Sequence, residues 1–198
     1  ASEIADLLSA RDMHYGIEGT YTYQQCRSCS LVFLNPMPTE AFLVRCYKDD
    51  YYSYQEYVDP PFWKRMLASL LFYHHRATGD PKFAKPGRVL DIGCGSGEFL
   101  LSMQKKGWET YGVEIGPKAA ELGNQRYALN IHCGTLLDAA FPDDWFDYVR
   151  LNHSFEHLAD PQTVLRRIRT ILRKDGLLFI GVPNVASISA RVFGKYWW

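Results

Sequence analysis

Apolar and polar positions alternate regularly in the second half of the chain. Short runs of apolar and β-branched residues predict buried strands, which are expected at 88–92, 109–114, 130–134, 146–151 and 177–182. Segments with apolar residues at helical spacing lie between them, at about 97–106, 117–126 and 161–173. Strands that alternate with helices in this way predict an α/β fold with a doubly wound, mostly parallel sheet and helices on both faces.

The helix expected at 161–173 shows this pattern clearly. Val164, Ile168 and Ile171 share one face, and arginines occupy the other. We interpret the arginine face as a solvated helix surface rather than a nucleic-acid site. The sequence Lys174-Asp175-Gly176 then predicts that a glycine cap ends the helix.

The first part of the chain has a different character. It carries a C-x-x-C pair, prolines and a tyrosine-dense run at 47–57, which together predict an irregular, aromatic-rich appendage. An amphipathic helix is expected at 62–76 and a Gly/Pro linker at 78–87. The tyrosines are expected either to form a lid over a ligand site of the main domain or to pack on this helix. The predicted division of the chain is an appendage at 1–60, a helix and linker at 61–87, and a main domain at 88–198.

Composition and charge narrow the class of protein. Hydrophobic residues make up 47% of the 198 residues, which suffices for a sizeable core, and 22 basic residues balance 22 acidic ones. A chain without net charge has no general attraction to nucleic acid or to an anionic membrane, so neither is an expected partner. The five cysteines are odd in number, the N-terminus lacks a basic region, and no apolar run is long enough to span a bilayer. These features favour a cytoplasmic protein, and they leave its oligomeric state open.

The most informative segment is a strand that breaks into glycines before a helix. Residues 89–100 read VLDIGCGSGEFL, with glycines at 93, 95 and 97. A dinucleotide site needs G-x-G-x-x-G, and here Glu98 stands in the position of the third glycine. Because an acid is poorly placed to meet a pyrophosphate, the loop predicts a ligand without phosphates. An NAD-dependent oxidoreductase remains a weaker alternative.

An acidic residue lies at an informative sequence spacing after this loop. Glu114 ends the second strand, 21 residues after Gly93. Doubly wound folds present a carboxylate to ribose hydroxyls at about this offset. We therefore predict that Glu114 is a ribose ligand.

These segments together resemble the class I S-adenosylmethionine-dependent methyltransferases. VLDIGCGSGEFL and YGVEIG carry the resemblance, and GTLLDAAFPDDWFDYV, LNHSFEHLADP and LRKDGLLFIGVPN continue it in order, over about 88–184. It implies a Rossmann-like fold, S-adenosylmethionine as cofactor and S-adenosylhomocysteine as product. The cofactor-binding residues that it implies are Asp91, Gly93, Cys94, Gly95, Gly97, Glu114, Ile115, Thr135, Leu136 and Asn152.

The resemblance also implies roles for parts of this set. Gly93 and Gly95 would approach the methionine part of the cofactor, and Asp91 would steady the loop. Thr135 and Leu136, after the third strand, would border the adenine.

The stretch that follows the fourth strand supplies the candidate catalytic residues His153, Glu156 and His157. As H-x-x-E-H it also matches an inverted zinc-peptidase motif, but that motif must lie on a helix, and here it directly follows a strand. Some ubiquinone-pathway O-methyltransferases have E-x-x-E-H in this place and use a metal; with His153 as the first residue, no metal is predicted. Asn152 would lie beside the reacting sulfonium. We expect His153 to be the general base with Glu156 and His157 behind it, or the latter two to be a structural pair.

The pair Cys26 and Cys29 resembles part of a zinc-ribbon-like segment. That segment precedes the methyltransferase domain in bacterial enzymes of sugar and polysaccharide biosynthesis, where a second C-x-x-C lies upstream. A zinc site needs four ligands, and no cysteine precedes Cys26. We therefore expect either that the partner pair lies outside this sequence or that the two cysteines are small residues in a turn.

The expected activity is methyl transfer to a small-molecule acceptor, with a sugar or polysaccharide precursor hydroxyl as the acceptor that the resemblance implies. A noncatalytic module that only binds S-adenosylmethionine is the main alternative. Only fifteen residues follow Pro183, whereas the family closes its sheet with a further hairpin. We therefore expect this sequence to be part of a longer protein, with that hairpin missing.

Overall fold

The computed structural model describes residues 3–12, 16–39, 42, 61, 63, 83 and 85–196. The chain divides into two compact units. We call residues 1–48 with 183–198 the N-terminal unit, and residues 49–182 the sheet unit. This division differs from the one expected from the sequence, because the residues after Val182 group with the first strands rather than with the parallel sheet.

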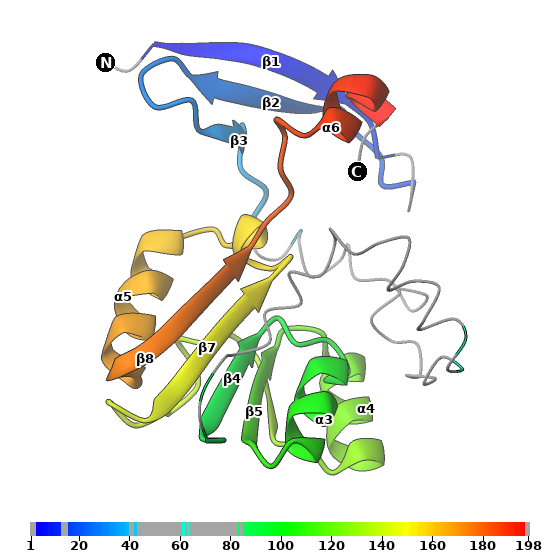
Figure 1. The fold of residues 1–198 in the computed structure, drawn as a ribbon. Coiled ribbons are helices and arrows are strands. Elements are labelled where there is room, and N and C mark those ends of the chain that lie inside the picture. The colour runs from blue at the N-terminus through cyan, green and yellow to red at the C-terminus, as the bar shows by residue number, and fades with distance from the viewer. Residues whose placement is uncertain are drawn as a thin grey trace. The chain divides into compact units, whose positions relative to one another are not determined.

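Five parallel strands form the sheet unit, in the order β6-β5-β4-β7-β8 (Figure 1). Their bounds are β4 Arg88–Ile92, β5 Glu109–Glu114, β6 Ile131–Cys133, β7 Phe146–Asn152 and β8 Leu172–Gly181. After β6 the chain returns to the other side of β4, so the direction of strand addition reverses between β4 and β7. Ligands of open α/β sheets bind outside the carboxyl ends of the strands at such a reversal.

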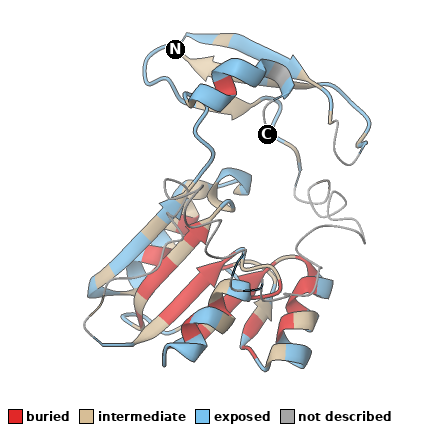
Figure 2. Cartoon of the chain, turned by 45° about the vertical axis from the view of Figure 1, so that its right-hand side comes forward, coloured by how far each residue is buried: buried red, intermediate tan, exposed pale blue. Residues whose placement is uncertain are grey.

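Helices cover both faces of this sheet. They are α3 Glu98–Lys105, α4 Pro117–Tyr127 and α5 Pro161–Ile171. Along β7, Val149 belongs to the same core cluster as Ile168 of α5, whereas its neighbour Tyr148 clusters with Met103 of α3. Because successive strand residues point to opposite faces, α3 and α5 lie on opposite sides. Buried residues gather in the middle strands and on the helix sides that face them (Figure 2), which confirms the predicted doubly wound architecture.

The last helix of the sheet unit ends earlier than the sequence predicts. Its final residue is Ile171, and the extended Leu172 already pairs with Phe146 of β7. Gly176 lies within β8 and does not have the positive φ of a glycine cap. A Cβ at Gly176 would come within 2.8 Å of the Leu172 side chain. The predicted cap is therefore wrong, and this glycine instead permits a close approach within an irregular strand.

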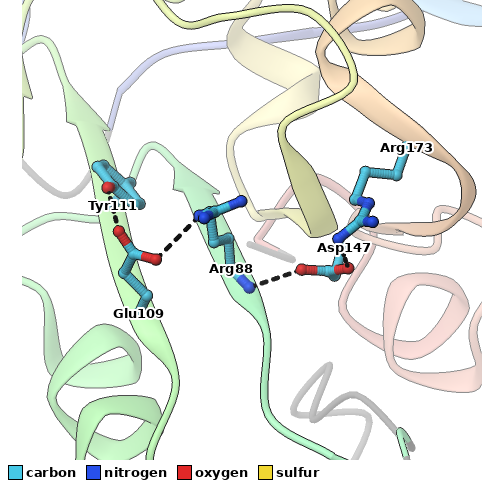
Figure 3. Close-up of polar contacts among 5 residues, drawn as sticks. All are labelled: Arg88, Glu109, Tyr111, Asp147 and Arg173. Carbon is cyan, nitrogen blue, oxygen red and sulfur yellow. Dashed lines mark hydrogen bonds and ion pairs between the residues drawn. The ribbon is translucent and has the colours of Figure 1, made fainter.

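A ladder of alternating charges crosses the amino ends of four strands (Figure 3). Glu109 accepts hydrogen bonds from the Tyr111 hydroxyl at 2.5 Å and from Arg88 Nε at 2.9 Å. Asp147 accepts from Arg88 N at 2.8 Å and from Arg173 Nη1 at 3.1 Å. We call these five residues the amino-edge ladder. Ion pairs join β5 to β4 and β7 to β8, and a backbone hydrogen bond from Arg88 joins β4 to β7, so the ladder favours this strand order.

The N-terminal unit contains an antiparallel sheet of β1 Ile4–Ala10, β2 Tyr21–Cys26 and β3 Val32–Leu34, followed at the end of the chain by α6 Ile188–Phe193 and the 3₁₀ turn η4 Gly194–Tyr196. The prediction of an irregular appendage is therefore wrong for this part. A hydrogen bond from Ser30 N to Cys26 O closes the turn between β2 and β3 at 2.8 Å. The strands escaped prediction because their residues are half-buried or exposed, without the alternation of a sheet with one buried face.

The helix expected at 62–76, apart from Trp63, and the tyrosines of 47–57 lie outside the described residues. Most of the linker expected at 78–87 does so as well. Among the helices that are described, none has the length and apolar character needed to cross a membrane.

Candidate cofactor and active site

The glycine loop, residues 93–97, turns the chain sharply between β4 and α3. Gly93, Gly95 and Gly97 all have positive φ, at 75°, 55° and 87°. The amides of Gly93 and Cys94 both donate to Val113 O, at 2.8 and 3.2 Å, which fastens the loop to β5. A Cβ on Gly93 would lie 2.5 Å from Ser154 Cβ. Glycine is therefore required here both by backbone conformation and by space.

The carboxylate of Glu114 joins this loop to the start of the next helix. It accepts a hydrogen bond from Gly95 N at 2.8 Å and another from Gly116 N at 2.7 Å. The residue is only 6% exposed. Burial raises the pKa of Glu114, and the amides of Gly116, Gly95 and Ile115 offset part of this rise. Since a carboxylate has about four acceptor positions, these bonds leave at least one for a ligand.

A buried ion pair lies directly before the loop. Arg150 Nη1 on β7 donates to both oxygens of Asp91, at 3.0 and 2.9 Å. Burial raises the pKa of Asp91 to about 6; Arg150 lowers this pKa, and the charge of Glu114 raises it. Asp91 belongs to the site predicted from the sequence, whereas Arg150 does not. The available signal was a single basic residue in the otherwise largely apolar strand FDYVRL.

Cys94 is held within the loop rather than presented as a reactive group. Burial raises the pKa of its thiol, and the nearby carboxylates Asp91 and Glu114 raise it further. A Cβ on Gly112 would lie 2.7 Å from Cys94 Sγ, so this glycine of β5 makes room for the thiol. The un-ionised thiol fills space under the loop.

The two residues after β6 that were expected to border an adenine differ in their surroundings. Thr135 donates from its amide and its hydroxyl to Asp138 Oδ2, at 3.1 and 2.7 Å, and these bonds lower the Asp138 pKa. The Leu136 side chain is 2% exposed and belongs to the main core cluster with Leu90 and Val149. Only the backbone of Leu136 is therefore placed to meet a ligand.

The segment after β7 is anchored to both neighbouring strands. Ser154 Oγ donates to Ile92 O at 2.7 Å, and His153 N donates to Gly181 O at 2.8 Å. His153 has a φ of 55°, which is unfavourable for a residue with a side chain. A Cβ on Gly181 would lie 2.6 Å from Asn152 Oδ1, so this pairing also depends on glycine.

The His153 side chain is 60% exposed, and its Nδ1 lies 3.8 Å from Glu156 Oε1. Residues 155–157 form a single 3₁₀ turn, η3 Phe155–His157, rather than the helix that a zinc-peptidase motif requires. Glu156 thus lies near His153, and no hydrogen bond joins it to the exposed His157 in the described part of the chain.

Cys26 and Cys29 lie at the turn between β2 and β3 of the N-terminal unit. Hydrogen bonds from the amides of Cys29 and Ser28 lower the pKa of the Cys26 thiol. Within the described ranges, no cluster of three or more histidine, cysteine, aspartate or glutamate residues could hold a metal ion.

Comparison with known families identifies the chain. A family model described as "Methyltransferase domain" matches residues 54–198. The chain belongs to this methyltransferase family. Members of the class I methyltransferase group use S-adenosylmethionine as methyl donor.

Individual relatives agree with this assignment. The ubiquinone biosynthesis O-methyltransferase of Aeromonas salmonicida is 32% identical over 109 residues, which cover 49% of this chain and 43% of that protein. The sterol 4-C-methyltransferase strm-1 of Caenorhabditis elegans is 26% identical over 141 residues, 67% of this chain and 42% of that protein. The crystal structure of PH0226 from Pyrococcus horikoshii superposes with a TM-score of 0.53 at 19% identity, covering 80% of this chain and 68% of that one. The chain thus spans about half the length of the first two relatives, and the third shows the shared fold.

The residues of this methyltransferase domain fit its donor. All predicted site residues follow the carboxyl ends of β4, β5, β6 or β7, or lie in their last positions. The glycine loop leaves bare backbone beside Glu114, whose carboxylate retains acceptor positions. Glu98 lies in the first turn of α3, where its negative charge would repel a phosphate at the start of the helix. This pattern suits a nucleoside without phosphates.

Proposed function

We propose that this chain transfers a methyl group from S-adenosylmethionine to a hydroxyl group of a small-molecule acceptor. The observation that carries the proposal is the buried Glu114 carboxylate, fixed by Gly95 N and Gly116 N at the end of β5. A carboxylate held in this way is placed to accept charge-assisted hydrogen bonds from a ribose diol. Membership of the methyltransferase family supports the same donor.

When bound, the donor supplies a methyl group activated by its positively charged sulfur. The chain must then hold donor and acceptor in line, since orientation lowers the barrier of such a displacement. We assign donor binding to the set predicted from the sequence: Asp91, Gly93, Cys94, Gly95, Gly97, Glu114, Ile115, Thr135, Leu136 and Asn152. Leu136 contributes through its backbone, because its side chain is in the core.

His153 is the proposed general base for the acceptor hydroxyl. A hydroxyl is a weak nucleophile until it loses its proton, and a neutral histidine accepts that proton near physiological pH. His153 is exposed at the carboxyl edge and is held at a φ of 55°, a strained conformation of the kind that gathers at functional sites. Glu156, at 3.8 Å from His153 Nδ1, is the proposed orienting group, with the exposed His157 as a second member of the stretch.

The acceptor is proposed as a class. The named relatives include an O-methyltransferase of ubiquinone biosynthesis and a sterol 4-C-methyltransferase, so carbon and oxygen acceptors both occur among them. A histidine base favours oxygen in this chain. The C-x-x-C turn supports a sugar or polysaccharide precursor through its resemblance to the enzymes of that group. We also propose a cytoplasmic location, on the grounds of the odd and scattered cysteines.

Calorimetry with the purified chain tests the donor. We expect S-adenosylmethionine and S-adenosylhomocysteine to bind and NAD not to bind. Denaturation should also release co-purified S-adenosylhomocysteine, which mass spectrometry would detect. Preference for NAD would overturn the proposal in favour of an oxidoreductase. Tight donor binding without methyl transfer to any hydroxyl compound, in the full-length protein, would instead indicate a noncatalytic module.

A further inference from the structure

A guanidinium lies buried in the sheet beside the glycine loop. Arg150 of β7 is in register with Asp91 of β4, and its side chain is only 12% exposed. Its Nη1 contacts both Asp91 oxygens, at 3.0 and 2.9 Å. The Arg150 Cζ atom also lies 4.1 Å from the centre of the Phe99 ring on α3. The sheet and α3 together therefore fix the position of this cation.

The need for a cation follows from the acids around it. Asp91 is 1% exposed and Glu114 is 6% exposed, so both carboxylates are removed from water. The charge of Glu114 disfavours ionisation of Asp91, and the Cys94 thiol adds no positive charge. In the described residues, the ionisable groups that act on Asp91 or respond to it are Arg150, Glu114 and Cys94. Of these three, Arg150 alone is positively charged.

We propose that Arg150 is a positioning residue of the donor site, which holds Asp91 as an ionised carboxylate so that the donor binds at neutral pH without release of a proton. This inference rests on the proposed donor function. The Asp91 pKa stands at about 6 with Arg150 in place, and it rises further when the guanidinium is removed. A protonated Asp91 then loses its proton when a cationic donor binds nearby, so binding becomes coupled to proton release.

Calorimetry at about pH 8 in buffers of different ionisation enthalpy measures this coupling with S-adenosylmethionine as ligand. We expect the wild-type chain to release almost no proton. Arg150→Met should release up to about one proton, and its donor affinity should fall about tenfold for each unit by which pH is lowered. The double variant Asp91→Asn/Arg150→Met should release none, because the titrating group is gone.

Two control variants separate this role from general damage. Arg88→Met removes another arginine that pairs with an acid and stacks on a ring, with its Cζ 3.9 Å from the Trp145 centroid, but at the amino edge. It should leave donor affinity and proton count unchanged. Arg150→Lys keeps the positive charge and should keep the proton count near zero. A merely structural role of Arg150 would weaken binding without changing the proton count.

The outcomes are distinguishable. If the wild-type chain binds no S-adenosylmethionine, the proposed function fails and this inference fails with it. If it binds, and Arg150→Met releases no more protons than wild type, only this inference is overturned. Should Arg150→Met fail to fold, the pH profiles of the wild type and the double variant decide. Wild-type donor affinity should fall below about pH 6 as Asp91 takes up a proton, and the double variant should lack that component. Identical profiles would overturn the inference.

Discussion

The two ends of strand β5 carry glutamates in opposite situations. Glu109 begins the strand with a side chain that is 52% exposed, and hydrogen bonds from Tyr111 and Arg88 lower its pKa. Glu114 ends the strand and is 6% exposed, and burial raises its pKa. Asp91 at the end of β4 follows the same rule, with a pKa of about 6. One strand thus holds the same residue type with opposite pKa shifts.

This difference teaches how the fold divides its tasks. At the amino edge, Glu109 and Asp147 keep contact with water and pair with arginine side chains. Such pairs contribute modestly to stability and favour one strand order. At the carboxyl edge, acids are removed from water and held by backbone amides and by Arg150. Burying these groups disfavours folding, because each unpaired acceptor position loses its water. A bound ligand that donates hydrogen bonds to these acceptor positions would offset this cost, and the carboxyl edge is where it would do so.

The largest effect should come from the proposed base at the carboxyl edge. His153→Ala should lower turnover by about 10²–10⁴-fold, the usual contribution of a general base. Donor affinity should stay near wild type, because His153 is proposed to serve the acceptor. Steady-state kinetics of the full-length protein with its acceptor measure turnover, and calorimetry measures donor affinity. Asp147→Asn, in the amino-edge ladder, is the control that should keep normal turnover. Near-normal turnover of His153→Ala would move the chemistry to another residue.

The next effect concerns the two glutamates of β5. Glu114→Ala should weaken donor binding by about 1.5–3 kcal/mol for each lost bond to its charged carboxylate. Glu109→Ala, in the same strand, should leave the donor affinity unchanged. Calorimetry with S-adenosylhomocysteine gives both values without turnover. If the two variants bound S-adenosylhomocysteine equally well, the difference between Glu109 and Glu114 would not concern donor binding.

The sequence predicted the carboxyl edge better than the rest of the molecule. The glycine spacing and Glu114 are local patterns, and both lie where the doubly wound order requires them. The role of Arg150 was not predicted because it depends on Asp91. That residue is 59 positions away along the chain and becomes a neighbour only when the strands pair. The N-terminal strands escaped because neither face is fully buried, so alternation of polar and apolar residues is weak there. Long-range pairing and shallow burial are the two kinds of information that periodicity does not contain.

Two glycines sharpen the comparison at the level of the backbone. Gly93 at the carboxyl edge and Gly107, just before the amino end of β5, have similar φ values of 75° and 85°. A Cβ on Gly93 would lie 2.5 Å from Ser154 Cβ, whereas the nearest described atom to a Cβ on Gly107 would be Pro86 Cγ at 3.6 Å. Both alanine variants should lose about 1–3 kcal/mol of unfolding free energy through strain. Only Gly93→Ala should lose more than this and also weaken donor binding. Equal losses in denaturant unfolding would show that space around Gly93 is not limiting.

The smallest effect should appear as opposite pH slopes at the two edges. Glu109 has a lowered pKa in the folded chain, so its stabilisation is present above its ordinary pKa of 4.5 and is lost as pH falls below it. Glu109→Gln should therefore cost about 0.2–1 kcal/mol at neutral pH, as expected for an exposed ion pair, and less in high salt. Asp91 has a raised pKa, so its ionisation lowers stability as pH rises from 3.8 to about 6. The double variant Asp91→Asn/Arg150→Met lacks this loss and should gain stability relative to wild type over the same range. Denaturant unfolding between about pH 4 and 7 checks both slopes. Slopes of the same sign would mean that the surrounding residues, rather than the edge of the sheet, determine how each acid contributes to stability.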